Sequence, residues 1–219
     1  MKFRAIIFDL DGTLLDTIED LADSMNAVLG RAGLPAHDVE AYKRFVGDGI
    51  EVLVERALPP GMRDARALRA FVAAMREEYG RRWKVKTAAY EGIEELLETL
   101  ARRGIKLAVL SNKPDDATKQ VVEALLPRAR FDVVLGARSG VPRKPDPTAA
   151  LDIARTLGVL PGECLYVGDS ATDVQTAAAA GMKPVGVLWG FRGAAELEGA
   201  GAKILISRPA EILDILRTG

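Results

Sequence analysis

Short apolar runs alternate with amphipathic stretches along most of the chain. Nearly continuous apolar runs are typical of strands that are covered on both faces, as in a parallel sheet. Six runs predict strands, the last more weakly than the others: residues 5–8, 106–110, 131–135, 164–167, 184–188 and 203–206. Between the later runs, the patterns predict helices at residues 93–102, 117–126, 148–157, 172–180 and 210–216. This alternation predicts an α/β fold with a doubly wound parallel sheet, a Rossmann-like core.

The segment 17–87 departs from this alternation and has a helical pattern throughout. Apolar residues recur there at i, i+3, i+4, i+7 and i+11, once at Ile18, Leu21, Ala22, Met25 and Leu29, and again at Leu68, Phe71, Val72, Met75 and Tyr79. Thr17, followed three residues later by Asp20, resembles a helix-start cap. We therefore expect residues 1–16 and 88–219 to form the α/β core, and residues 17–87 to form an α-helical cap domain inserted after the first strand.

Composition narrows the possible chemistry. The 219 residues include 30 Lys and Arg against 31 Asp and Glu, so no basic field for nucleic acid is expected. One Cys and one His exclude an internal disulfide, a Cys/His zinc cluster and a site with several His ligands. No stretch approaches the roughly 20 apolar residues that span a bilayer, and no secretory segment is recognisable. We therefore expect a cytoplasmic protein whose chemistry depends on carboxylates, Lys, Arg and hydroxyl groups.

Two acids, Asp9 and Asp11, come directly after the first predicted strand. One interpretation is an ordinary turn, in which Asp and Gly are common. The alternative is a functional site, because ligands of open α/β sheets bind beyond the carboxyl ends of the strands. In extended chain, residues two apart project to the same side, and two adjacent carboxylates repel each other unless positive charge lies between them.

Two other predicted strands are also followed by polar residues. Asp169 and Asp173 follow the strand at 164–167, where Ser170 and Asp173 also fit a helix capping box. That structural interpretation leaves Asp169 unexplained. Ser111 and Asn112 follow the strand at 106–110, which is ordinary turn chemistry, although a helix start at this point would offer backbone N–H groups to an anion.

Lys144 lies in the proline-containing loop 143–147, where a single lysine is usually solvated. Together, however, these elements would place four acids and Lys144 at one edge of the sheet, with a local charge near -3. Such a cluster requires a divalent cation, and an all-oxygen site suits Mg²⁺. Ser111 and Lys144 would supply a donor and a positive charge for a phosphoryl group. A metal, an anion clamp and a spare carboxylate are the components of phosphoryl transfer.

The order and spacing of four elements resemble the motifs of the haloacid dehalogenase-like hydrolase superfamily. The elements are Asp9-Leu10-Asp11-Gly12-Thr13, Ser111, Lys144-Pro145, and Gly168-Asp169 to Asp173. The inserted helical segment matches the helical cap of that superfamily, so the resemblance covers the whole chain. Because a dehalogenase would lack the second acid, Asp11 indicates the phosphatase branch. Within it the chain is most similar to the phosphoglycolate phosphatases, on the stretches 9–17, 46–49, 52–58, 111–114 and 190–192.

The resemblance implies Mg²⁺-dependent hydrolysis of a small phosphomonoester, with 2-phosphoglycolate as the expected substrate, through an aspartyl-phosphate intermediate. Asp9 would be the nucleophile, and Asp11 the general acid and then the general base. The carboxylates of Asp9 and Asp169 and the backbone carbonyl of Asp11 would hold the metal, with Asp173 orienting that site. Three further residues would hold the phosphoryl oxygens: Ser111, Asn112 and Lys144.

The helical cap would close over the site and exclude water, with hinges at Thr17 and residues 85–90. The loop Gly47-Asp48-Gly49 is the part of the cap expected to face the substrate, although it could be a plain helix–helix turn. Arg44 and Arg56 could each bind a substrate carboxylate or be solvated helix charges.

Other functions remain open from the sequence. A phosphomutase or a pyrophosphatase of the same superfamily would share every catalytic residue. A receiver-type signalling domain also combines acids, a hydroxyl and a lysine, but it is about half this length and lacks the helical insertion. A scaffold protein would have no reason to fill all the catalytic positions. We expect a small phosphorylated metabolite as partner, no nucleic acid, no membrane, and a monomer or homodimer.

Overall fold

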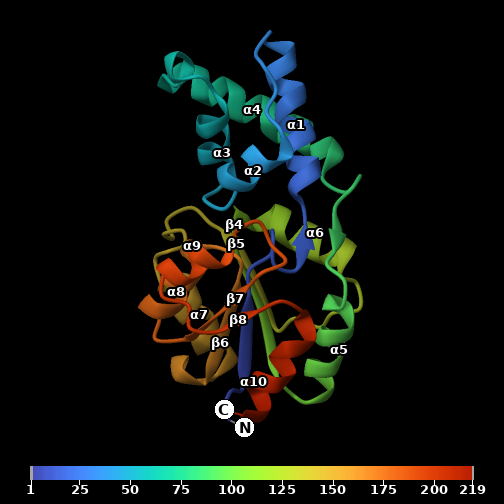
Figure 1. The fold of residues 1–219 in the computed structure, drawn as a ribbon, viewed down its shortest axis with the longest axis vertical. Coiled ribbons are helices and arrows are strands. Elements are labelled where there is room, and N and C mark those ends of the chain that lie inside the picture. The colour runs from blue at the N-terminus through green and yellow to red at the C-terminus, as the bar shows by residue number, and fades with distance from the viewer. Residues whose placement is uncertain (1, 219) are drawn as a thin grey trace. The chain divides into compact units, whose positions relative to one another are not determined.

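The computed structural model describes residues 2–218, and within it the chain divides into two compact units. The first unit comprises Met1–Leu15 and Ala89–Gly219, and the second comprises Asp16–Ala88. Figure 1 shows the second unit, in blue to blue-green, as a group of helices, and the first unit as strands with helices around them. The chain leaves and re-enters the first unit through two short strands, β2 (Leu15–Asp16) and β3 (Ala88–Ala89), which pair with each other.

The first unit contains, within residues 2–218, a six-stranded sheet in the order β5-β4-β1-β6-β7-β8. All neighbouring strands are parallel, which confirms the predicted doubly wound α/β sheet. The strand β1 lies between β4 and β6. The strands are β1 (Ala5–Phe8), β4 (Lys106–Pro114), β5 (Val133–Ala137), β6 (Cys164–Gly168), β7 (Lys183–Val187) and β8 (Leu205–Ile206).

Helices cover both faces of this sheet (Figure 1). On one face, buried side chains of α7 and α8 pack against Ile7, Leu110 and Tyr166 of the strands. The helices α5 and α10 lie on the opposite face. The α-helices are α5 (Ile93–Arg102), α6 (Asp115–Leu125), α7 (Thr148–Leu157), α8 (Ala171–Ala179), α9 (Ala194–Gly199) and α10 (Ile212–Thr218), with short 3₁₀ helices at η2 (Pro161–Glu163) and η3 (Pro209–Glu211).

The main departure from the predicted elements is the length of β4. The apolar run ends at Leu110, but the strand continues to Pro114 through the polar residues Ser111, Asn112 and Lys113, and its register against β5 shifts after Leu110. All three polar side chains are buried. The helix α6 then starts at Asp115, two residues before the predicted start. The six-residue helix α9 was not predicted, because its sequence has too few apolar residues to show a helical period.

The second unit consists mainly of helices, as the apolar spacing of residues 18–29 and 68–79 predicts. The helix α1 packs along α4, and their buried faces include Met25, Leu29, Met75 and Tyr79. Nothing among the described helices has the length and apolar character needed to cross a membrane. The helices of this unit are α1 (Ile18–Arg31), α2 (Val39–Phe45), α3 (Ile50–Ala57), the 3₁₀ helix η1 (Pro60–Met62) and α4 (Ala65–Arg82).

The predicted cap at the start of α1 is wrong. The Thr17 side chain makes no capping bond, and its hydroxyl has no hydrogen-bond partner among the described residues. The buried carboxylate of Asp20 points instead to the end of the same unit. It accepts hydrogen bonds from the backbone N–H of Lys86 at 3.0 Å, the N–H of Thr87 at 2.9 Å and the Thr87 hydroxyl at 2.7 Å. Asp20 therefore joins the two ends of the segment that forms the second unit.

Replacing Asp20 by Ala is expected to lower the free energy of unfolding by about 2–4 kcal/mol, because it leaves buried N–H and hydroxyl donors without an acceptor. Urea unfolding followed by circular dichroism measures the change. Asp23→Ala is the matched control, since Asp23 forms an exposed ion pair with Lys86 at 2.8 Å and its loss should cost under about 1 kcal/mol. Equal losses in the two variants would contradict the role given to Asp20.

Candidate active site

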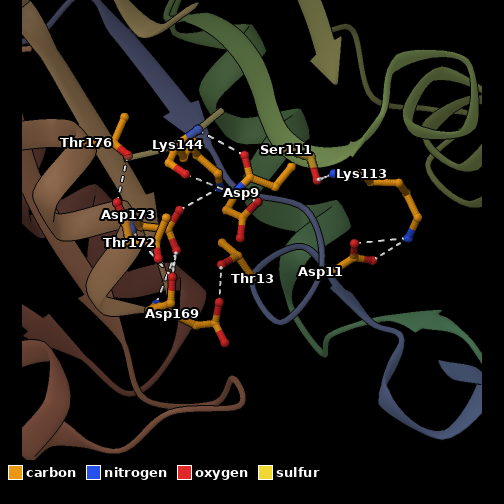
Figure 2. A network of polar contacts seen from close by, with 12 residues as sticks. Asp9, Asp11, Thr13, Ser111, Lys113, Lys144, Asp169, Thr172, Asp173 and Thr176 are labelled. Atoms are coloured by element: carbon orange, nitrogen blue, oxygen red, sulfur yellow. Dashed lines mark hydrogen bonds and ion pairs between the residues drawn. The ribbon is translucent and has the colours of Figure 1, made fainter. Parts of the chain in front are cut away.

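The candidate site lies at the carboxyl ends of three neighbouring strands in the first unit. Asp9 directly follows β1, Asp169 directly follows β6, and Ser111 lies near the end of β4. Because β1 pairs with both β4 and β6, these residues come together although they are far apart in the sequence. Figure 2 shows them with Lys144, from the loop before α7, around one small region. The parallel register places these side chains at the edge where open α/β sheets bind ligands.

Lys144 lies at the centre of the acidic group (Figure 2). Its Nζ is 2.8 Å from Asp9 Oδ1 and 2.7 Å from Asp173 Oδ1, and its side chain is only 3% exposed. The backbone of Lys144 is fixed by Asn112, whose Oδ1 accepts from the Lys144 N–H at 3.0 Å and whose Nδ2 donates to the Lys144 carbonyl at 3.2 Å. Asn112, which we expected to hold a phosphoryl group, thus positions Lys144 in this structure. Direct binding of a phosphoryl group by Asn112 stays a prediction.

Asp173 both caps the helix α8 and belongs to the site, so the structural and the functional interpretation of this residue both hold. Its Oδ2 accepts hydrogen bonds from the Ser170 hydroxyl at 2.6 Å and from the Ser170 N–H at 3.2 Å, which forms the capping box at the start of α8. Its other oxygen, Oδ1, contacts Lys144. The capping box therefore fixes the carboxylate in the orientation that reaches the site.

The backbone at Gly12 and Gly190 packs closely against Asp169. Its Oδ2 accepts a hydrogen bond from the Phe191 N–H at 2.7 Å, and the Thr13 hydroxyl lies 3.5 Å from its Oδ1. A Cβ atom at Gly190 would lie 2.3 Å from Asp169 Cβ, and one at Gly12, where φ is +87°, would lie 2.4 Å from Asp169 Oδ2. Only glycine allows both backbones to approach this carboxylate so closely.

The buried acids carry more negative charge than the lysine balances. Burial, followed by the carboxylate of Asp173, raises the pKa of Asp169 to about 7. Burial and the carboxylates of Asp173 and Asp169 also raise the pKa of Asp9 well above its usual value, although Lys144 opposes this shift. For Lys144 itself, burial lowers the pKa, but Asp173 and Asp9 outweigh it and keep the ammonium protonated.

This charge surplus fits a divalent cation. Carboxylate oxygens of Asp9, Asp169 and Asp173 all lie within 4.8 Å of one another, and all three residues are buried. Hard carboxylate oxygens at a site short of positive charge are the kind of donor that suits Mg²⁺ or a similar ion. The resemblance implies that the first two residues bind the metal and that Asp173 has a supporting position. The oxygens that Asp173 directs to Lys144 and Ser170 are consistent with that supporting position.

Lys113 is a residue of the site that the sequence patterns do not predict. Its Nζ lies 2.7 Å from Oδ1 and 3.0 Å from Oδ2 of Asp11, and its side chain is 7% exposed (Figure 2). The Ser111 hydroxyl oxygen accepts the Lys113 backbone N–H at 3.2 Å. Once β4 is seen to continue to Pro114, the period of two along a strand places Ser111 and Lys113 on the same face, which is the signal that could have found Lys113.

Two aromatic residues after β7 also contribute, although nothing in the sequence required it. The Trp189 indole Nε1 donates to the Thr13 carbonyl at 3.0 Å, and Phe191 supplies the N–H that binds Asp169. The segment 189–191 therefore fixes the loop that follows Asp9 and Asp11. Residues 189–191 follow β7, and in the sheet only β6 separates β7 from β1. The tertiary fold, rather than the local sequence, therefore brings them to this loop.

The residues expected to face the substrate from the second unit lie in the loop between α2 and α3. Gly47 and Gly49 both have positive φ, +120° and +96°. Asp48 Oδ2 forms an ion pair with Arg56 at 2.7 Å, and Arg56 also donates to the carbonyl of Arg44 at 3.4 Å. Arg56 thus stabilises this loop within its own unit. Contact of Gly47, Asp48 or Gly49 with substrate stays a prediction.

Comparisons with known proteins agree with this geometry. A family model described as haloacid dehalogenase-like hydrolase matches residues 6–187. The chain is 35% identical over 223 residues to the phosphoglycolate phosphatase of Chromobacterium violaceum, a match that covers 99% of this chain and 97% of that protein. A crystal structure described as a candidate phosphoglycolate phosphatase from Lactobacillus delbrueckii subsp. bulgaricus has a TM-score of 0.92 and 32% identity, covering 99% of both chains. A candidate beta-phosphoglucomutase from Thermotoga maritima has a TM-score of 0.75 and 28% identity over 99% of both chains.

Proposed function

Because the chain belongs to the haloacid dehalogenase-like hydrolase family, we propose that it is a phosphatase that hydrolyses a small phosphomonoester, 2-phosphoglycolate, in two steps through an aspartyl-phosphate. One observation carries this proposal. The buried Asp9 carboxylate, at the carboxyl end of the central strand β1, contacts a buried lysine and clusters with two further buried acids. The names of the relatives support the choice of substrate.

In the first step, a carboxylate oxygen of Asp9 attacks phosphorus and the bond from phosphorus to the ester oxygen breaks. Lys144, 2.8 Å from Asp9, favours the ionised form of that carboxylate and orients it. Asp11 gives a proton to the departing alkoxide. In the second step, Asp11 takes a proton from the water that attacks the aspartyl-phosphate, so phosphate is released and Asp9 is restored.

Asp9 and Asp169, with the Asp11 carbonyl, would hold Mg²⁺, and Asp173 would orient these ligands. When bound, the cation neutralises negative charge on the phosphoryl oxygens and on the clustered carboxylates. Ser111 and Lys144 would bind phosphoryl oxygens, with the Asn112 side-chain amide fixing the Lys144 backbone through both its oxygen and its nitrogen. We further propose that the second unit acts as a cap that excludes water during the first step.

The test is a comparison of phosphate release from 2-phosphoglycolate, pyrophosphate and glucose 1-phosphate, each with and without MgCl₂. We expect release with Mg²⁺ only, and a kcat/KM at least tenfold higher for 2-phosphoglycolate than for the other two compounds. Faster conversion of glucose 1-phosphate to glucose 6-phosphate, without phosphate release, would identify a phosphomutase, which the likeness to the Thermotoga maritima protein keeps as the second candidate. Preference for pyrophosphate would identify a pyrophosphatase.

A further inference from the structure

The first unit holds a second buried lysine at the site, Lys113, to which the proposed reaction assigns no role. Both oxygens of the Asp11 carboxylate face its Nζ, at 2.7 and 3.0 Å. The contact is largely shielded from water, since the side chains of Lys113 and Asp11 are 7% and 15% exposed. In Figure 2 the pair lies to one side of Asp9, and Lys144 lies to the other. The site therefore has two cations, one on either side of the proposed nucleophile.

The two cations face different parts of a substrate. Lys144 contacts Asp9, where the phosphoryl group would be. Lys113 contacts Asp11, which would donate its proton to the leaving oxygen, so the organic part of the substrate begins beside the Lys113–Asp11 pair. In a phosphate ester of an α-hydroxy acid, a single carbon separates the ester oxygen from a carboxylate. That carboxylate would consequently lie within reach of the Lys113 ammonium group.

We infer that Lys113 binds the substrate carboxylate and thereby selects phosphate esters of α-hydroxy acids. The inference rests on the proposed phosphatase function and deepens it. An ammonium group has three N–H donors and can hold two carboxylates at once. Lys144 already does so in the same site, with Asp9 and Asp173 at 2.8 and 2.7 Å. Of the two arginines that could bind a substrate carboxylate, Arg44 and Arg56, the second forms an ion pair with Asp48 within the second unit and donates to the Arg44 carbonyl.

The experiment compares 2-phosphoglycolate with ethyl phosphate, which has the same ester bond and a methyl group in place of the carboxylate. The kcat/KM of each ester is measured for the wild-type enzyme, Lys113→Met and Lys113→Arg. In Lys113→Met the loss of the Asp11 contact slows the hydrolysis of both esters. This common factor cancels in the ratio of the two kcat/KM values. We expect that ratio to fall at least about 30-fold in Lys113→Met, and to stay within about fivefold of wild type in Lys113→Arg.

An unchanged ratio in Lys113→Met overturns the inference and leaves Lys113 as a positioning residue for Asp11. If that variant does not fold, the test is the kcat/KM of the wild-type enzyme for 2-phosphoglycolamide, in which a neutral amide replaces the carboxylate. A kcat/KM equal to that of 2-phosphoglycolate overturns the inference, and a loss of 30-fold or more supports it. Failure of the proposed function looks different, because the wild-type enzyme would then release phosphate from none of these esters.

Discussion

Replacing Asp9 by Asn lowers kcat for 2-phosphoglycolate by at least about 10⁴-fold while the fold remains intact. The amide has no anionic oxygen to attack phosphorus, so the covalent step is lost completely rather than slowed. The Lys144 contact at 2.8 Å is also weakened, because a neutral amide replaces one of its two carboxylate partners. Phosphate release under saturating substrate and MgCl₂ measures the effect, and circular dichroism with a melting curve verifies the fold.

Asp132→Asn is the matched control for this substitution. The Asp132 carboxylate accepts the Leu107 N–H at 2.8 Å at the amino end of the sheet, away from the site. Its loss should leave kcat within about twofold of wild type. An Asp9→Asn enzyme that retained even a tenth of the wild-type rate would refute the assignment of Asp9 as the nucleophile.

Replacing Asp169 by Asn stabilises the metal-free protein at alkaline pH and abolishes its activity. The folded-state pKa of Asp169 is about 7, because of burial and the neighbouring Asp173, whereas an unfolded Asp has a pKa of about 3.9. The folded state therefore binds this proton more tightly. The stabilisation that this proton gives to the folded state is complete below about pH 4 and is lost as the pH rises through about 7. Asn carries no such charge, so its contribution does not change with pH.

The measurement is urea unfolding of both proteins in EDTA at pH 5 and pH 8. The free energy of unfolding of Asp169→Asn minus that of wild type should increase by about 2–3 kcal/mol between these values. Adding MgCl₂ at pH 8 should raise the Tm of the wild-type protein and leave that of the variant nearly unchanged. A difference that is constant with pH would show that Asp169 is ionised in the folded protein at both values. An equal rise in Tm for both proteins would exclude Asp169 as a metal ligand.

The sequence predicts the parallel sheet well, because each buried strand is itself a nearly continuous run of apolar residues. It also predicts which residues follow those strands, and parallel strands bring their carboxyl ends to one edge. The polar end of β4 could not be predicted in this way. Asn112 and Lys113 are buried there only because each finds a distant partner, the Lys144 backbone for one and the Asp11 carboxylate for the other. Local patterns carry no information about such partners.

The same limit explains the error at Asp20. Thr17 and Asp20 have the spacing of a capping box, and within four residues nothing distinguishes a cap from a long-range contact. The N–H groups and the hydroxyl that Asp20 binds come from Lys86 and Thr87, more than sixty positions further along the chain. The short helix α9 was missed for the opposite reason, since its structure is local but its only buried apolar residue is Leu197.

The position of β1 in the middle of the sheet affects how the enzyme is made. The strand β1, which ends at Phe8 directly before Asp9, is synthesised first, yet its two neighbours are β4 and β6, and β6 ends only at Gly168. During translation this apolar segment lacks both neighbours until β4 has been made, at Pro114, and lacks its second neighbour until β6 has been made, at Gly168. The second unit is a continuous segment and is complete as soon as Ala88 has been added. We therefore expect nascent chains truncated before β6 to expose Ala5–Phe8 to chaperones and to aggregation, even when their helical unit is already folded.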